Sequence, residues 1–366
     1  MANAAERLEA IRALPTPAAP VRILNVCGGH ERSITEIGLR SLLPGWIKLL
    51  PGPGCPVCVC PEEAIYHAIR MALEHPLTLV AFGDMLRVPV NVSKTEPASL
   101  AAARAAGADI RPIASPLEVI ALARQLAPRP VVFFAAGFET TMAPVAAMLA
   151  DATLPANLFV LLAGRLTWPA VKYLLDAGDC GFDAMIAPGH VAAVMGANEW
   201  RFVAEKHAMP VSVAGFSAES LLTAVYTVLT RTRRQEAALD NAYPKIVKPE
   251  GNPQAQKMLM SAFDIEDANW RGIGVIPRSG YRLAQRHAGR DAAARFPLSA
   301  GSERRRAGEM PPGCDCAEVL LARKAPDQCR LYGTACTPEH PVGPCMVSDE
   351  GACHIWWAAG LRKPLS

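Results

Sequence analysis

The sequence lacks a strong excess of charge and is poor in aromatic residues. Its 366 residues have a formal net charge of only +3, and Phe, Trp and Tyr make up 6% of the chain. The basic runs at 231–234 and 304–306 are isolated and have no interleaved aromatic side chains, which is typical of solvated surface rather than of a nucleic-acid interface. We therefore expect no nucleic-acid partner.

Long hydrophobic runs are also lacking. Residues 1–20 include acidic side chains and no apolar segment of signal-peptide length, and the run "PVVFFAAG" is far too short to cross a bilayer. These features predict a cytoplasmic protein with no membrane partner. In a reducing compartment, eleven cysteines are expected to bind metal or to perform redox chemistry rather than to form a structural disulfide framework.

The phosphate-binding signatures G-x-x-x-x-G-K-[ST] and G-x-G-x-x-G are absent, so the sequence does not support nucleotide binding. From about residue 22 to 229, short apolar runs instead alternate regularly with stretches of helical period. Such alternation predicts parallel sheets covered by helices on both faces. We expect an α/β fold, with two parallel-sheet α/β domains at 1–115 and 116–235 and a smaller cysteine-rich domain at 236–366.

Four conspicuous loops follow predicted strands: "VCGGHE", "GPGCPVCVCP", "GFETT" and "APGHV". Ligands of parallel α/β sheets bind outside the carboxyl ends of the strands, where such loops lie. His30, Glu139 and His190 are therefore candidate catalytic residues, together with the cysteines of these loops. The alternative for the "GFETT" segment is a plain helix start with a threonine as N-cap.

Cys27 ends a predicted strand, before Gly28, Gly29 and a helix expected to begin near His30. The backbone N–H groups and the positive end of that helix favour a thiolate, and the two glycines allow a ligand to approach the backbone closely. The alternative is a buried cysteine at the end of a strand. The polar neighbours of Cys27 favour a functional thiol.

Cys55 and Cys58 form a C-P-V-C motif, whose spacing suits either a shared metal or a reversible disulfide. A closed zinc site is disfavoured because no second C-x-x-C and no His pair lie nearby. Cys60 precedes Pro61, a natural first helical residue, so Cys60 is expected at a cap position.

The C-terminal cysteines follow the pattern C-x-C-x₁₂-C-x₆-C-x₈-C-x₇-C, which is neither a ferredoxin run nor a zinc ribbon. Six cysteines can supply four ligands for a [4Fe–4S] cluster and a dithiol. In an extended C-x-C segment the two side chains point in opposite directions, so the two cysteines are assigned to different centres. We expect the cluster ligands to be Cys314, Cys329, Cys336 and Cys353, and the dithiol to be Cys316 and Cys345, although spacing alone does not exclude Cys353 as the partner of Cys316.

Several of these motifs together resemble one known family, the HypD hydrogenase maturation factors. The matching segments are "CGGH", "GPGCPVC", "GFETT", "PGHV", "EGNPQAQ", "WRGIG" with "IPRSG", and "CTPEHPVGPCMVSDEGAC". They cover the chain from about Arg22 to the C-terminal region. Departures are Glu31 where the family often has threonine, Cys60 at a position that is usually not cysteine, and the less acidic residues 217–220.

The resemblance implies two α/β domains joined to a [4Fe–4S] domain. It also implies a scaffold on which the Fe(CN)₂CO unit of [NiFe]-hydrogenases is assembled, with a small HypC-like chaperone and a HypE-like cyanide donor as partners. Cys27 would then be an iron ligand, with Cys55 and Cys58 as further iron ligands or as the redox pair. Such a scaffold is not a conventional turnover enzyme, and we expect a monomer that binds its partners transiently.

Two other interpretations remain open. Because a cluster next to a dithiol is what such chemistry requires, the chain could be an iron–sulfur-dependent disulfide reductase that acts on a protein thiol. The third hypothesis is that the chain is a structural zinc protein with only a binding role.

Overall fold

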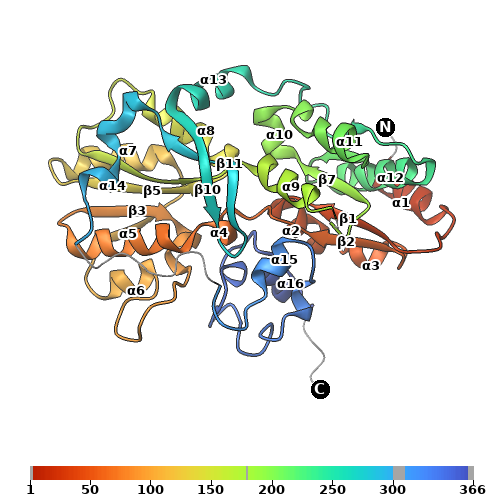
Figure 1. The fold of residues 1–366 in the computed structure, drawn as a ribbon, viewed down its shortest axis with the longest axis horizontal. Helices are drawn as coiled ribbons and strands as arrows, with labels where there is room; N and C mark the ends of the chain where they lie inside the picture. Colours follow the sequence, from red (N-terminus) through yellow and green to blue (C-terminus); the bar gives the residue numbers. More distant parts are fainter. Residues whose placement is uncertain (1–2, 179, 300–309, 362–366) are drawn as a thin grey trace.

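Two parallel sheets and a cysteine-rich C-terminal segment make up the computed structural model, which describes residues 3–178, 180–299 and 310–361 (Figure 1). The first sheet has five parallel strands in the order β2-β1-β7-β8-β9. Its strands are β1 (Val21–Asn25), β2 (Ile47–Pro51), β7 (Ala184–Pro188), β8 (Val211–Ala214) and β9 (Leu239–Asn241).

Alternate residues of the first sheet enter two different cores. Ile23 and Ile186 pack with one helical layer, whereas Leu24 and Met185 pack with the other. Helices around this sheet are α1 (Ala4–Arg12), α2 (Gly28–Glu36), α3 (Leu39–Leu42), α9 (Thr167–Asp176), α10 (Gly189–Met195), α11 (Arg201–His207) and α12 (Ala218–Arg234), with the 3₁₀ turn η2 (Ala197–Trp200). The sheet is therefore covered on both faces, as its near-continuous apolar strands predict.

The second sheet has four parallel strands in the order β4-β3-β5-β6. Its strands are β3 (Thr78–Phe82), β4 (Ile110–Ile113), β5 (Val131–Gly137) and β6 (Leu158–Gly164). Every residue of β5 is buried, because side chains from two separate cores cover its faces. Elements around this sheet are α5 (Glu62–Glu74), η1 (Gly83–Arg87), α6 (Leu100–Ala105), α7 (Pro116–Leu126), α8 (Glu139–Leu149), η3 (Gln285–Arg290) and α14 (Ala292–Arg295).

The expected fold class is confirmed, with two parallel-sheet α/β units and a cysteine-rich C-terminal region. The sheets, however, do not follow the expected boundary at residue 115. That boundary separates β4 from β5 within one sheet, and the first sheet joins β1 and β2 to strands from residue 184 onward. Helical and strand periods identify the units along the chain, whereas long-range packing decides which strands become neighbours.

The segment after residue 236 contributes to the first sheet, to the core of the second sheet and to the region between them. Strand β9 completes the first sheet, and α13 (Pro253–Ala262) packs on the second-sheet core through Leu259 and Ala262. An antiparallel hairpin then follows, made of β10 (Phe263–Trp270) and β11 (Gly274–Leu283). Sequence analysis did not predict this hairpin, which stands at the centre of the molecule between the two sheets (Figure 1).

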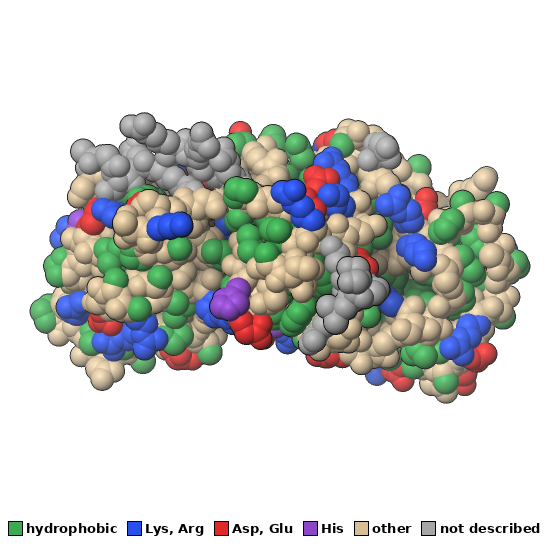
Figure 2. Space-filling view, turned by 90° about the horizontal axis from the view of Figure 1, so that it is seen from below, with side chains coloured by type: hydrophobic (Ala, Val, Ile, Leu, Met, Phe, Trp, Pro, Cys, Tyr) green, Lys and Arg blue, Asp and Glu red, His purple; other side chains and the backbone are tan. Residues whose placement is uncertain are grey.

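The cysteine-rich segment, residues 310–361, lies below the junction of the two sheets (Figure 1). Its regular elements are short: α15 (Cys316–Leu320), η4 (Pro326–Gln328), η5 (Pro344–Met346) and α16 (Ala352–Ala358). Seen from below, the surface mixes acidic, basic and hydrophobic side chains (Figure 2). Among the described residues, no helix is both long and apolar enough to span a membrane.

Candidate functional site

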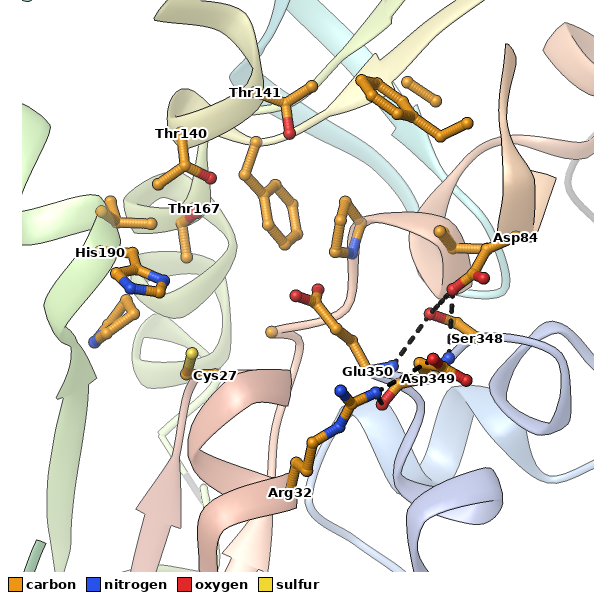
Figure 3. Close-up of a pocket in the computed structure, with 18 of the residues that line it drawn as sticks. Cys27, Arg32, Asp84, Thr140, Thr141, Thr167, His190, Ser348, Asp349 and Glu350 are labelled. Atoms are coloured by element: carbon orange, nitrogen blue, oxygen red, sulfur yellow. Dashed lines mark hydrogen bonds and ion pairs between the residues drawn. The ribbon is translucent and has the colours of Figure 1, made fainter. Parts of the chain in front are cut away.

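A cavity of about 400 Å³ opens where the carboxyl ends of strands from both sheets meet the cysteine-rich segment (Figure 3). The loops after β1, β5 and β7 and the C-P-V-C loop after β2 all contribute to its wall, as do η1 and the residues before α16. Its polar lining residues include Cys27, Arg32, Asp84, Thr140, Thr141, Thr167, His190, Ser348, Asp349 and Glu350. The four loops that sequence analysis singled out therefore do meet at one place.

Cys27 is held at this cavity by close backbone packing. It directly precedes α2, and the Gly28 N–H donates to the Gly54 carbonyl at 3.0 Å. A Cβ on Gly54 would lie 2.4 Å from the Cys27 nitrogen, so only glycine allows this approach. The main chain of the C-P-V-C loop is thus fixed against that of Cys27.

The expectation of a readily formed Cys27 thiolate is corrected by its surroundings. The side chain keeps some accessible surface toward the cavity, but protein encloses it otherwise, and this burial raises its pKa to about 12. The N–H groups of His30 and Gly29 act in the opposite direction, and the nearby Glu350 raises the pKa further. Cys27 is therefore a protonated thiol at neutral pH.

Cys55 and Cys58 form a disulfide across α4 (Pro56–Val59), and the Cys58 N–H donates to the Cys55 sulfur at 3.2 Å. Both are buried, and Cys55 shares a small crevice with Cys27. Because the thiolate is the metal-binding form of cysteine, the pair must be reduced before either sulfur can bind iron.

Cys60 does not have the expected capping role. Helix α5 begins at Glu62 with Pro61 as its N-cap, so Cys60 lies one residue further out, at the end of α4. Its thiol is 1% exposed, and burial raises its pKa to about 12. Pro61 shifts the helix start by one residue, because its own extended backbone serves as the cap.

His30 and His190 lie on different sides of the cavity wall. His30 is fully buried, where its Nε2–H donates to the Ala214 carbonyl at 2.9 Å and its Nδ1 lies 3.2 Å from Asn25 Oδ1. Burial lowers the pKa of His30 to about 4. His190 lines the cavity itself, and Phe216 packs against both imidazoles, with ring centroids 4.8 Å from His30 and 4.0 Å from His190. Burial also lowers the pKa of His190.

Glu139 lies behind the wall rather than in it. Its buried carboxylate accepts hydrogen bonds of 2.7 Å from both the N–H and the hydroxyl of Thr167, the first residue of α9. Burial raises the pKa of Glu139 to about 6 in spite of these bonds. Glu139 thus orients Thr167, which does line the cavity.

One part of the wall was missed by sequence analysis, namely the acidic loop before α16. Asp84 accepts hydrogen bonds from the Ser348 hydroxyl at 3.0 Å and from the Asp349 N–H at 3.1 Å, and Arg32 forms an ion pair with Asp349 at 3.3 Å. Glu350 points into the cavity near Cys27 (Figure 3), and burial raises its pKa. The signal was the run "SDEG" close to Cys353, which was quoted as a family motif but given no role.

The C-terminal thiols contact one another. The sulfurs of Cys314 and Cys316 are 3.2 Å apart, so the premise that C-x-C is extended here is wrong. Asp315 has φ −96° and ψ 20°, and α15 begins at Cys316, which turns both side chains to the same side. Hydrogen bonds with Cys316 raise the pKa of Cys345 and lower that of Cys353 to about 6. The division of the six cysteines between cluster and dithiol stays a prediction.

The donor set suits an iron–sulfur cluster in kind and number, because such clusters are held by cysteine thiolates. Cys314 and Cys316 are near enough to Cys336 to raise its pKa, and Cys329 packs in the same group of buried side chains. Among residues 3–178, 180–299 and 310–361, no group of three or more His, Cys, Asp or Glu side chains is arranged to hold a metal ion, so the fit to a cluster lies in the kind and number of the donors and not in their arrangement.

The two groups of cysteines, far apart in sequence, share one hydrophobic core. Cys55 and Cys58 pack in the same cluster as the C-terminal cysteines, together with Trp270 and Tyr332. Trp270 also stacks on Phe138 of the cavity wall at a centroid distance of 5.8 Å. The hairpin that sequence analysis missed therefore connects the cavity, the disulfide and the C-terminal thiols.

The fold and the site define a class, that of two-lobed α/β proteins with a thiol site and a cysteine-rich tail where the lobes meet. Known proteins of this kind match nearly the whole chain. The family described as "HypD: Hydrogenase formation hypA family" matches residues 2–360. The chain belongs to this HypD family of hydrogenase maturation factors.

Individual relatives agree with that assignment. The chain is 38% identical to hydrogenase maturation factor HypD2 of Bradyrhizobium diazoefficiens, over 96% of this chain and 93% of the relative. It is 35% identical to HypD of Azotobacter vinelandii, over 99% of this chain and 95% of the relative. It is 38% identical to HypD of Rhodobacter capsulatus, over 94% and 91% respectively.

Proposed function

We propose that this hydrogenase maturation factor is the scaffold on which an Fe(CN)₂CO unit is assembled. A small HypC-like chaperone and a HypE-like cyanide donor would be its partners, in the cytoplasm, with the chain acting as a monomer in transient complexes. The observation that supports this proposal most strongly is the cavity at which Cys27 lies beside the Cys55–Cys58 loop. A thiol, a reducible disulfide and a space for a small ligand complex occur together there.

In this proposal Cys27 binds the substrate iron through its sulfur. Because its thiol is protonated at neutral pH, iron must displace a proton, as metal binding to cysteine generally does. Glu350 points into the same cavity and acts electrostatically on the Cys27 thiol, so its carboxylate is suited to receive that proton. His190 and the hydroxyls of Thr140 and Thr141 face the remaining space and can donate hydrogen bonds to ligands on the iron.

Cys55 and Cys58 become iron ligands only after reduction, which consumes two electrons and two protons per disulfide. The C-terminal cysteines would hold a [4Fe–4S] cluster, which when bound supplies single electrons. Cys316 and Cys345, with sulfurs in contact, can act as the intermediate dithiol. Their common core with Cys55 and Cys58 gives a short route for these electrons.

The test is the infrared spectrum of the chain purified with its chaperone. The proposal predicts stretching bands of bound cyanide and CO, and it predicts that the amount of bound iron exceeds the content of the cluster. A complex that contains the cluster but never shows these bands would contradict the scaffold role.

The alternative, an iron–sulfur-dependent disulfide reductase, is favoured by one observation, the common core of the disulfide and the C-terminal thiols. A reductase would turn over a protein disulfide repeatedly and would not require Cys27. Activity of Cys27→Ala toward a protein disulfide, without iron-bound CO or cyanide in the wild type, would select this alternative. A colourless, zinc-loaded wild-type protein would contradict both and support the structural zinc reading.

A further inference from the structure

Arg271, at the tip of the β10–β11 hairpin, is a buried cation with unused hydrogen-bond donors. Its side chain is fully buried, and its Nη2 donates to the Pro89 carbonyl at 2.8 Å. Among the described residues, neither Nε nor Nη1 has a hydrogen-bond partner. A guanidinium has one N–H on Nε and two on Nη1, so three buried donors have no acceptor within the described part of the chain. Such donors are costly to leave unpaired, which points to a further acceptor.

The nearby carboxylate does not account for these donors. Glu62, which is also fully buried, forms an ion pair with Arg271 at Nη2, with an N–O distance of 3.7 Å. Its oxygens accept hydrogen bonds from the backbone and side chain of Asn91. Glu62 therefore compensates part of the charge but leaves Nε and Nη1 available.

The backbone around Arg271 places it between the two groups of cysteines. The Arg271 N–H donates to the Val59 carbonyl at 3.0 Å, which ties the hairpin tip to α4, next to Cys58. On the other side, a Cβ on Gly272 would lie 2.9 Å from the Cβ of Ala317, the neighbour of Cys316. The sulfurs of Cys316, Cys60 and Cys314 are the groups besides Glu62 that favour the charged form of Arg271.

We propose that Arg271 is a charge-stabilising residue of the redox centre held by the C-terminal cysteines, and that its free N–H groups donate to sulfur atoms of that centre when it is bound. This inference rests on the proposed function, because it takes the C-terminal cysteines to hold an iron–sulfur centre. Addition of one electron to such a centre makes it more negative by one charge, and hydrogen bonds to its sulfurs favour the reduced form. Arg271 would therefore make the centre easier to reduce.

The experiment is a redox titration of the cluster by visible and electron paramagnetic resonance spectroscopy, with dithionite as the electron donor. We expect Arg271→Met to shift the midpoint potential to a more negative value. The shift should be at least about 59 mV, which for one electron is a tenfold change in the ratio of reduced to oxidised centre. Arg271→Lys keeps the charge but loses the planar set of N–H donors. Its midpoint potential should therefore lie between those of the wild type and of Arg271→Met.

Arg165 offers a matched control. It is also buried and also near Cys60, but its Nε and Nη2 donate to the Asn269 carbonyl and its Nη1 donates to the Gly164 carbonyl. Arg165→Met should therefore leave the midpoint unchanged. Because Arg271→Met leaves Glu62 buried without its cation, the charge-neutral pair Arg271→Met with Glu62→Gln is the second variant and should show the same shift.

The outcomes separate this inference from the function on which it rests. A wild-type protein without iron and acid-labile sulfide would overturn the proposed cluster and the inference together. A loaded Arg271→Met protein, or a loaded double variant, with the wild-type midpoint would overturn the role of Arg271 alone. A shift of equal size in Arg165→Met would also overturn it, because any buried cation would then have the same effect.

Discussion

The two groups of cysteines are held in place in opposite ways. Cys27 and the C-P-V-C loop lie at the ends of sheet strands, where the backbones of Gly28 and Gly54 are hydrogen-bonded and in direct contact. The C-terminal cysteines lie on very short helices and loops, and their sulfurs contact each other. The geometry of the first group follows from the sheets, whereas that of the second follows from packing between short elements. This difference fits the proposed scaffold, in which the first group would bind and release iron and the second would keep a cluster.

The largest contrast is expected when one cysteine is removed from each group. Cys329→Ser or Cys336→Ser should lose the cluster, roughly four irons per chain, and unfold residues 310–361, because metal binding and folding are coupled. Cys27→Ala should keep the cluster and the fold but stop hydrogenase maturation. Iron and sulfide analysis with circular dichroism checks both. Loss of the cluster in Cys27→Ala would show that the two groups are one centre.

Substitution of Gly54 and of Gly343 tests the same difference between the two groups of cysteines through packing. In Gly54→Ala the new Cβ would meet backbone atoms of Val26 and Cys27 within 2.7 Å, so we expect a loss of stability on the order of 3 kcal/mol. In Gly343→Ala the atoms nearest the new Cβ would be the sulfurs of Cys314 and Cys316, at 2.4 and 2.6 Å. Side chains can move, so this variant should lose iron with little effect on the sheets.

Urea unfolding and iron content distinguish these two effects. Gly45→Ala is the control for both, since its new Cβ has no atom within 4 Å. If Gly54→Ala were as stable as Gly45→Ala, the rigid contact between the two loops would be refuted.

The raised pKa of Glu139 predicts that the free energy of unfolding depends on pH. Because its pKa rises from 4.5 to about 6 on folding, the folded state binds this proton more tightly than the unfolded state. Its contribution to stability should therefore decrease as the pH rises from about 4.5 to about 6 and stay constant above that, a change of about 2 kcal/mol. Denaturant unfolding of the wild type and of Glu139→Gln across this range gives the difference. A difference that increases with pH would contradict the assigned burial.

The smallest effect is expected at Cys60, which follows the C-P-V-C motif and packs in the core of the second sheet. Its buried thiol neither caps α5 nor lines the cavity among the described residues. Cys60→Ala should cost about 1 kcal/mol of stability and leave maturation intact. A maturation assay comparable to that used for Cys27→Ala decides this, and a complete loss would make Cys60 an obligatory ligand.

Sequence analysis located the local elements well and their long-range partners poorly. The apolar runs that it expected between about residues 22 and 229 do form strands, and the four loops that it singled out line one cavity, because periodicity and strand-end position are local properties. Strand order in the sheets and the β10–β11 hairpin were not predicted, since they depend on packing between distant segments. The buried donors of Arg271 and the contact of Cys314 with Cys316 also depend on local backbone geometry that no spacing rule contains.

The central claim is that the C-terminal thiols control the redox state of Cys55 and Cys58 through their common core. Both cysteines are buried, with exposed fractions of 3% and 0%, which limits direct contact of an external reductant with their sulfurs. The most direct measurement is mass spectrometry of alkylated thiols after treatment of the cluster-loaded protein with a one-electron donor. The account predicts that Cys55 and Cys58 are reduced in the wild type and remain a disulfide when Cys316→Ser and Cys345→Ser are combined. Equal reduction in both proteins would contradict it.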